Sequence, residues 1–121
     1  MHELSIAQAL LDEIEAAARS RQALRVAAAT VSVGPLSGVE PELLVRAFEM
    51  ARRTRLVTLD TELTLETAEV RVACSACEQD GPASPNDLRC RHCTNPQSRL
   101  IGGDELLLLR VEMDVPAVNA A

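Results

Sequence analysis

The sequence is poor in aromatic and basic side chains, and both shortages limit what the protein can bind. Phe48 is the only aromatic residue among 121, so aliphatic side chains must form the core and no aromatic platform exists for stacking nucleic-acid bases. Lysine is absent, and 12 arginines face 18 acidic residues, for a formal net charge of -6. Because affinity for phosphate backbones comes mainly from clustered positive charge, we expect no nucleic-acid partner. A cation or a basic protein surface suits this composition better.

Long apolar stretches are also missing. No segment approaches the roughly 18 consecutive apolar residues of a membrane span, and residues 1–20 lack the basic start and apolar run of a signal peptide. We therefore expect no membrane association and a cytoplasmic location. In that compartment, four cysteines indicate metal or redox chemistry more often than disulfide bonds.

Two segments have the apolar spacing of amphipathic helices. The first begins at Leu4 and repeats apolar residues on one face, while charged residues occupy the other. The second covers residues 39–53, with Pro41 suited to the first helical turn. The predicted buried positions of the two helices are Leu4, Ala7, Leu11, Ile14, Ala18, Leu44, Ala47, Phe48 and Ala51.

Three further segments alternate in the manner of β-strands. The first covers residues 24–33. The second is one long strand over residues 59–74, in which a change of phase near Glu66 predicts a bulge or a bend. The last strand covers residues 104–115 and is predicted to place its apolar side chains on one face. That face consists of Leu107, Leu109, Val111 and Met113.

This order of elements predicts an α+β fold, with two helices packed on one face of a three-stranded sheet. The composition changes abruptly at residues 74–99, which hold all four cysteines, three of the six prolines and almost no large aliphatic residue. Such a segment cannot collapse by apolar burial alone, so we expect a separate zinc-ribbon-like domain with four cysteine ligands, inserted before the last strand. The predicted domains are therefore residues 1–73 plus 100–121, and residues 74–99.

The cysteines follow a symmetrical metal-binding pattern. They read C-x2-C-x12-C-x2-C through Cys74, Cys77, Cys90 and Cys93. Two residues between cysteines allow one tight turn to present both thiolates to a single ion, and two facing turns complete a tetrahedron. Four protein ligands leave no open coordination position. We therefore expect a structural Zn2+ whose binding supplies folding energy to this segment.

The cysteine segment also has rival interpretations. Iron is less favoured than zinc, because the glycine and aromatic residues that usually surround a rubredoxin iron are missing. A pair of disulfides, a redox-active dithiol and a zinc ribbon that binds nucleic acid or protein also fit four cysteines. His92 is either a surface residue or a replacement ligand. Three arginines either offset the charge of the tetrathiolate or lie on a solvated turn: Arg89, Arg91 and Arg99.

The first three residues form a second candidate metal site. The amine of Met1, the deprotonated amide of His2 and the nearer ring nitrogen of His2 can close fused chelate rings around one ion. Only ions that favour square-planar nitrogen donors, chiefly Ni2+ and Cu2+, induce such amide deprotonation. Glu3 can supply a fourth donor from its carboxylate or its own amide, or it can simply lie at the positive end of a helix. A histidine at position two is by itself a weak signal.

In combination, these features resemble the HypA/HybF family of hydrogenase nickel incorporation proteins. The matching stretches are the MHE start, VSVGPLSGVEPELLVRAFEM, the two CxxC motifs and the closing GGDELLLLRVEMD. The resemblance covers residues 1 to about 115. It implies a two-helix, three-stranded domain that binds nickel through Met1, His2 and Glu3. It also implies a zinc domain inserted before the last strand, with the four cysteines as ligands.

The function that the resemblance implies is a non-enzymatic nickel metallochaperone. Such proteins deliver Ni2+ to the large subunit of [NiFe]-hydrogenase together with a HypB-type GTPase, and in some organisms they also serve urease and its accessory proteins. Ser5 and Ser32 have no histidine or acid partner that we can identify, so no catalytic residue is predicted. The alternative function is a zinc-ribbon adaptor without a nickel role. A homodimer is left open.

Two departures from the family pattern concern turns rather than ligands. Each CxxC motif with the residue that follows it is called a knuckle here. The second knuckle reads CRHCT, where the family often reads CPxCG, and this change predicts a less rigid turn with Arg91 and His92 more exposed. The segment between the second helix and the long strand also lacks the glycines that the family often carries there.

Overall fold

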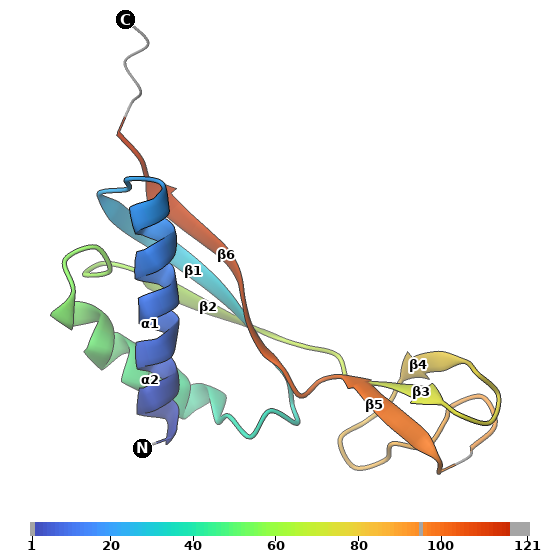
Figure 1. Ribbon diagram of the computed structural model, residues 1–121. Helices are drawn as coiled ribbons and strands as arrows, with labels where there is room; N and C mark the ends of the chain where they lie inside the picture. Colours follow the sequence, from blue (N-terminus) through green and yellow to red (C-terminus); the bar gives the residue numbers. More distant parts are fainter. Residues whose placement is uncertain (1, 95, 117–121) are drawn as a thin grey trace, which may run out of the picture. The chain divides into compact units, whose positions relative to one another are not determined.

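The computed structural model describes residues 2–94 and 96–116. It confirms the predicted α+β class, with two helices, a three-stranded sheet and a cysteine-bearing insertion before the last strand (Figure 1). The elements in chain order are α1 (His2–Ser20), β1 (Arg25–Val33), α2 (Pro41–Ala51), the 3-10 helix η1 (Arg52–Thr54), β2 (Glu62–Thr67), β3 (Arg71–Cys74), β4 (Asp80–Pro82), β5 (Ser98–Gly102) and β6 (Leu106–Asp114).

The two helices supply most of the apolar core. α1 begins at His2, two residues before the predicted start, so the first helical turn includes both His2 and Glu3. α2 begins at Pro41, as its fixed backbone angle favours. The buried apolar residues of α1 and α2 are Ala7, Leu10, Leu11, Ile14, Ala18, Leu44, Phe48 and Ala51. The core is therefore aliphatic around a single aromatic ring.

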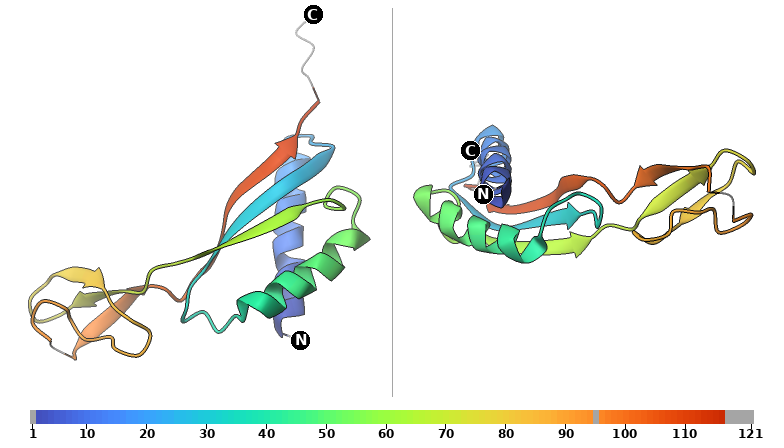
Figure 2. Two further views of the ribbon diagram at one scale, coloured as in Figure 1. Left: turned by 180° about the vertical axis from the view of Figure 1, so that it is seen from behind. Right: turned by 90° about the horizontal axis from the view of Figure 1, so that it is seen from below.

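α1 covers one face of a sheet in which β1 is the central strand, and α2 packs against α1. The strand order is β2-β1-β6, so β2 and β6 form the edges. α1 crosses in front of β1 and β6 in Figure 1, and the strands lie in front of α1 in the reverse view of Figure 2. The side chains of Val26 and Val31 in β1 are fully buried. This arrangement leaves the start of α1 at the surface.

The segment predicted as one long strand is divided between two sheets. β2 ends at Thr67 and pairs in the helix-covered sheet, whereas β3 begins at Arg71 and lies in a second sheet. The intervening residues bond elsewhere: the N–H of Ala68 donates to the carbonyl of Val33, and the carbonyl of Val70 accepts from Ala83. The predicted change of phase is thus a strand break rather than a bulge.

The second sheet carries the first cysteine pair. It is antiparallel, in the order β4-β3-β5, with Val72 of β3 opposite both Gly81 and Leu100. A register irregularity lies between Arg71 and Val72 in the pairing with β5. Because β3 ends at Cys74, this sheet fixes the position where the first knuckle begins.

The last strand differs from its prediction in the faces of its leucines. In β6, Leu107 and Leu109 are 51% and 52% exposed, while Val111 and Met113 are half-buried. The predicted apolar face is therefore wrong for its first half. Because four leucines are consecutive, the sequence fits a strand with either set of alternate residues facing inward. The alternation of buried and exposed residues shifts by one position between Leu109 and Val111.

The chain forms two compact units. One comprises the described parts of Met1–Val31, Glu40–Leu65 and Leu108–Ala121, and the other comprises Ser32–Val39 and Glu66–Leu107. The predicted domain boundaries, 1–73 plus 100–121 and 74–99, stay a prediction. The division by contacts between residues falls at other positions. The second unit is larger than the cysteine segment because β3, β5 and the loop after β1 belong to it.

Two glycines allow a close approach of backbones in the second unit. A Cβ atom on Gly34 would overlap the carbonyl oxygen of Gly103. The same loop donates from Leu36 N–H to the Gly103 carbonyl and from Gly34 N–H to the Glu105 carbonyl, both at 2.8 Å. A side chain at position 34 would separate these segments.

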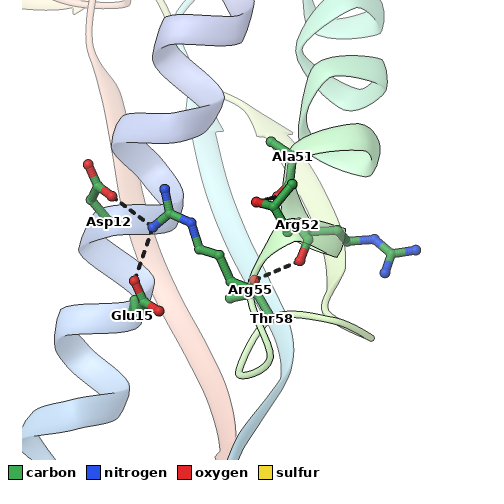
Figure 3. A network of polar contacts seen from close by, with 7 residues as sticks. Asp12, Glu15, Ala51, Arg52, Arg55 and Thr58 are labelled. Atoms are coloured by element: carbon green, nitrogen blue, oxygen red, sulfur yellow. Dashed lines mark hydrogen bonds and ion pairs between the residues drawn. The ribbon is translucent and has the colours of Figure 1, made fainter.

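A polar network joins α1 to the turn that follows α2. Arg55 reaches from the end of η1 to the carboxylates of Asp12 and Glu15, at 2.7 and 3.2 Å (Figure 3). The hydroxyl of Thr58 donates to the carbonyl of Arg52 at 3.0 Å and closes the turn. Within residues 2–94 and 96–116, no helix combines the length and the apolarity that a membrane crossing requires.

Candidate metal centre

The four cysteines lie together, as the sequence predicts. Their sulfur atoms are all within 4.8 Å of one another and form the only such cluster among the described residues. Cys74 ends β3, Cys77 follows in the turn after it, and Cys90 and Cys93 occupy the second turn. The sulfurs of Cys74 and Cys93 are 3.5 Å apart, and those of Cys77 and Cys90 are 3.6 Å apart.

These separations suit a metal ion and exclude disulfide bonds. A tetrahedron with zinc–sulfur bonds of about 2.3 Å has edges of about 3.8 Å, close to the two sulfur separations. A disulfide bond would require about 2.05 Å, and all four cysteines are free thiols. Cys74 and Cys90 are buried, at 4% and 3% exposure. The donor set therefore fits a closed tetrathiolate zinc site, whose role is structural.

Backbone amides lower the pKa of the two buried thiols. The N–H of Cys77 is the main cause for Cys74, and with the N–H of Ala76, 3.4 Å from the sulfur, it lowers the Cys74 pKa to about 6. The N–H of Cys93 likewise lowers the pKa of Cys90. Hydrogen bonds to a thiolate favour the charged form, which is the form that binds a metal.

Each knuckle ends in a residue with left-handed backbone geometry. Glu78 directly follows Cys77 with a φ of 59°, and Thr94 directly follows Cys93 with a φ of 56°. The N–H of Thr94 donates to the carbonyl of Cys90 at 2.8 Å and closes the second knuckle. Glycine adopts this geometry most easily, and a β-branched residue adopts it least easily. The T of CRHCT therefore occupies the strained position of the turn.

Arg89 and His92, which lie next to the cysteines in the sequence, are both exposed. Arg89 is bonded to Asp87, with both distances at 2.9 Å, and this arginine lowers the pKa of the Asp87 carboxyl. Arg89 is thus held by a carboxylate on the surface turn. His92 is exposed and lies outside the sulfur cluster, in agreement with its interpretation as a surface residue.

The second candidate site is described in part. His2 is exposed at the start of α1. The Glu3 carboxylate accepts a hydrogen bond from the N–H of Glu40 at 3.3 Å. That backbone donor is the main cause of a lowered Glu3 pKa, with the N–H of Glu3 itself next in importance. Met1 lies outside the described residues, so the proposed chelate of Met1, His2 and Glu3 stays a prediction.

Sequence reasoning missed three residues with local roles. Glu78 and Thr94 follow the CxxC motifs, and a signal existed for Thr94, because the family often carries glycine at the end of the second knuckle. Glu40 contacts Glu3 through its backbone, which no side-chain pattern reveals. The separation of 37 positions between them gives no indication of contact.

The fold and the cysteine cluster define a class: small α+β proteins with a closed tetrathiolate metal centre inserted before the last strand. A family model described as "Hydrogenase/urease nickel incorporation, metallochaperone, hypA" matches residues 1–113. The chain belongs to this HypA family, as the resemblance of its motifs indicated.

Individual relatives agree with this assignment. The chain is 41% identical over 113 residues to the hydrogenase maturation factor HypA of Nitrosospira multiformis, covering 93% of this chain and 97% of the relative. It is 37% identical over 115 residues to that of Wolinella succinogenes, with 94% and 96% coverage. The solution structure of the Ni metallochaperone HypA from Helicobacter pylori matches with a TM-score of 0.74 and 28% identity, over 93% of this chain and 97% of that one.

Proposed function

We propose that this protein is a nickel metallochaperone of hydrogenase maturation, which binds Ni2+ through Met1, His2 and Glu3. The observation that carries the proposal is the family match over residues 1–113, which includes both candidate metal sites. The exposure of His2 at the start of α1 supports it, since a carrier must accept and release its cargo at the surface. The tetrathiolate centre cannot serve this purpose, because it has no open position.

The beginning of a helix favours amide coordination to nickel. The first four N–H groups of an α-helix have no intrahelical acceptor. α1 begins at His2, so deprotonation of the His2 or Glu3 amide breaks no hydrogen bond of the helical ladder. The negative charge that results lies near the positive end of the helix dipole, which stabilises it. Chelation at this end is therefore compatible with an intact α1.

The resident zinc has a different role from the nickel cargo. Cys74, Cys77, Cys90 and Cys93 hold it, and its charge keeps all four sulfurs as thiolates and organises the two knuckles. We propose that the protein acts without enzymatic chemistry in the cytoplasm. Its partners are then a HypB-type GTPase and the large subunit of [NiFe]-hydrogenase, with urease accessory proteins as a further client system.

One comparison of three proteins tests the nickel site. These are the chain with its native terminus, the His2→Ala variant, and a form extended by a few residues before Met1. Zinc content is measured by elemental analysis, and Ni2+ binding by titration with absorbance for planar coordination. We expect one tightly held zinc in all three and specific nickel binding in the native form alone. Equal nickel binding by all three would contradict the proposal and favour a zinc-ribbon adaptor.

A further inference from the structure

The N-terminus of α2 lacks the usual capping partner from its own chain segment. Its N-cap residue is Glu40, with φ -84° and ψ 111°, and the Glu40 side chain makes no capping hydrogen bond among the described residues. In a capping box, a Glu or Gln at the third helical position accepts from the N–H of the N-cap residue. That position is Leu43 here, which offers no acceptor.

Glu3 of α1 supplies the missing acceptor from the neighbouring helix. Its Oε2 atom lies 3.3 Å from the N–H of Glu40, so the bond joins the first turn of α1 to the N-cap of α2. The carboxylate also places a negative charge at the positive end of the α2 dipole. The contact therefore reproduces half of a capping box between two helices.

This hydrogen bond gives the Glu3 carboxylate a structural role that is distinct from metal binding. The structure assigns a positioning role to the Glu3 carboxylate, which tethers the start of α1 to α2 and holds His2 in place for nickel, and the backbone amide of Glu3 is then the nickel donor of that residue. The inference rests on the proposed nickel function and deepens it. Terminal turns fray when nothing restrains them, and a ligand set on a frayed turn must be ordered when the ion binds. The tether orders the turn before nickel arrives.

Both ends of the bond can be removed separately. Glu3→Ala removes the acceptor, and Glu40→Pro removes the donor, because proline has no N–H. The φ and ψ of Glu40 are compatible with proline, including one that precedes Pro41. Two matched controls keep the bond: Glu3→Gln retains an acceptor oxygen, and Glu40→Gln retains the backbone N–H. Zinc content and the melting temperature show which variants keep the fold.

We expect Glu3→Ala and Glu40→Pro each to weaken nickel binding by about fivefold, the magnitude of a helix cap. The double variant should be no weaker than either single variant, since both remove the same bond. Glu40→Gln should bind as the unmodified protein does, within about twofold, and Glu3→Gln should bind more tightly than Glu3→Ala because it retains the acceptor oxygen. In the NMR spectrum, the Glu40 amide resonance should shift in Glu3→Ala and should persist when planar, diamagnetic Ni2+ is added.

Two results would overturn the inference, and they differ from a failure of the proposed function. If Glu3→Gln loses nickel as Glu3→Ala does while Glu40→Pro binds normally, the carboxylate is a ligand and not a tether. Normal binding by Glu3→Ala also overturns it. If the unmodified protein and His2→Ala bind nickel equally, the nickel function itself fails and the tether has no role in it.

Discussion

The two compact units of this protein are held together by different forces. In the helical unit, Leu11, Ile14, Val26, Leu44 and Phe48 are completely or almost completely removed from water. Among the described residues of the cysteine-bearing unit, the buried hydrophobic ones are few: Val33, Val70, Val72, Cys74 and Cys90. Two of these five are predicted metal ligands. Apolar burial therefore stabilises the first unit, whereas the second depends on its ion.

The difference explains how one chain of 121 residues can carry two metals in distinct ways. A structural ion must be retained, so it is enclosed by four ligands from two turns. A cargo ion must be exchanged, so its predicted site lies at the exposed start of α1, on the unit that has an apolar core. The following variants test whether the two units differ in what stabilises them.

Loss of zinc should have the largest effect, and it should be confined to one unit. Cys90→Ala removes a buried ligand, and binding free energy on the order of 10 kcal/mol or more is then unavailable for folding. NMR spectra should show collapsed resonances for the cysteine-bearing unit and dispersed resonances for α1 and α2. His92→Ala is the matched control and should retain one zinc. Unfolding of the helices in Cys90→Ala would show that the units are not independent.

Truncation of the core aromatic residue should affect the other unit. Phe48 is 0% exposed, so Phe48→Ala should lower the free energy of unfolding of the helical unit by about 3–5 kcal/mol. Chemical denaturation followed by circular dichroism measures this loss. On the same helix, Met50 is 71% exposed, and Met50→Ala should cost less than about 0.5 kcal/mol. Similar losses for the two variants would contradict the burial of this helix face.

Two glycine substitutions in the loop after β1 should differ in cost. Gly34→Ala forces a Cβ atom against the backbone of Gly103 and should destabilise the protein by about 2 kcal/mol or more. Gly38→Ala has open space but a φ of +78°, so its cost should be about 1 kcal/mol. Thermal unfolding of the zinc-loaded protein gives both values. The reverse order would show that the close approach of Gly34 and Gly103 is wrong.

The smallest predicted effect is a gain in stability. Thr94→Gly relieves the left-handed backbone at the end of the second knuckle and should stabilise the zinc-bearing unit by up to about 1 kcal/mol. Slower zinc release to a chelator is the measurement, and Glu78→Gly in the first knuckle should act in the same direction. A faster release from Thr94→Gly would mean that the hydroxyl contact of Thr94 with the Cys93 carbonyl matters more than backbone strain.

Local patterns predicted the elements of the helical unit and the ligands of the metal centre. The apolar spacing that places Leu11 and Ile14 on one face is a property of neighbouring residues, and the spacing of the CxxC motifs is likewise local. The break between β2 and β3 depends on partners far along the chain, such as Val33 for Ala68. The faces of β6 were ambiguous because four leucines are consecutive.

The N-terminal site shows the same limit of sequence reasoning. The order Met1, His2, Glu3 indicates a chelate through general nickel chemistry, and this remains a prediction for residues of which His2 and Glu3 alone are described. The contact of Glu3 with Glu40 joins two helices through a backbone N–H. A residue's side chain carries no signal for such a contact, so only the three-dimensional structure could reveal it.

X-ray absorption spectroscopy at both metal edges, on the protein loaded with zinc and nickel together, tests the separation of the two sites most directly. Four sulfur neighbours are predicted around zinc. Nitrogen and oxygen neighbours, including histidine and no sulfur, are predicted around nickel in the native chain, with loss of the histidine signal in His2→Ala. Sulfur neighbours around nickel would place the cargo in the cysteine cluster and would contradict the assignment of nickel to the N-terminus.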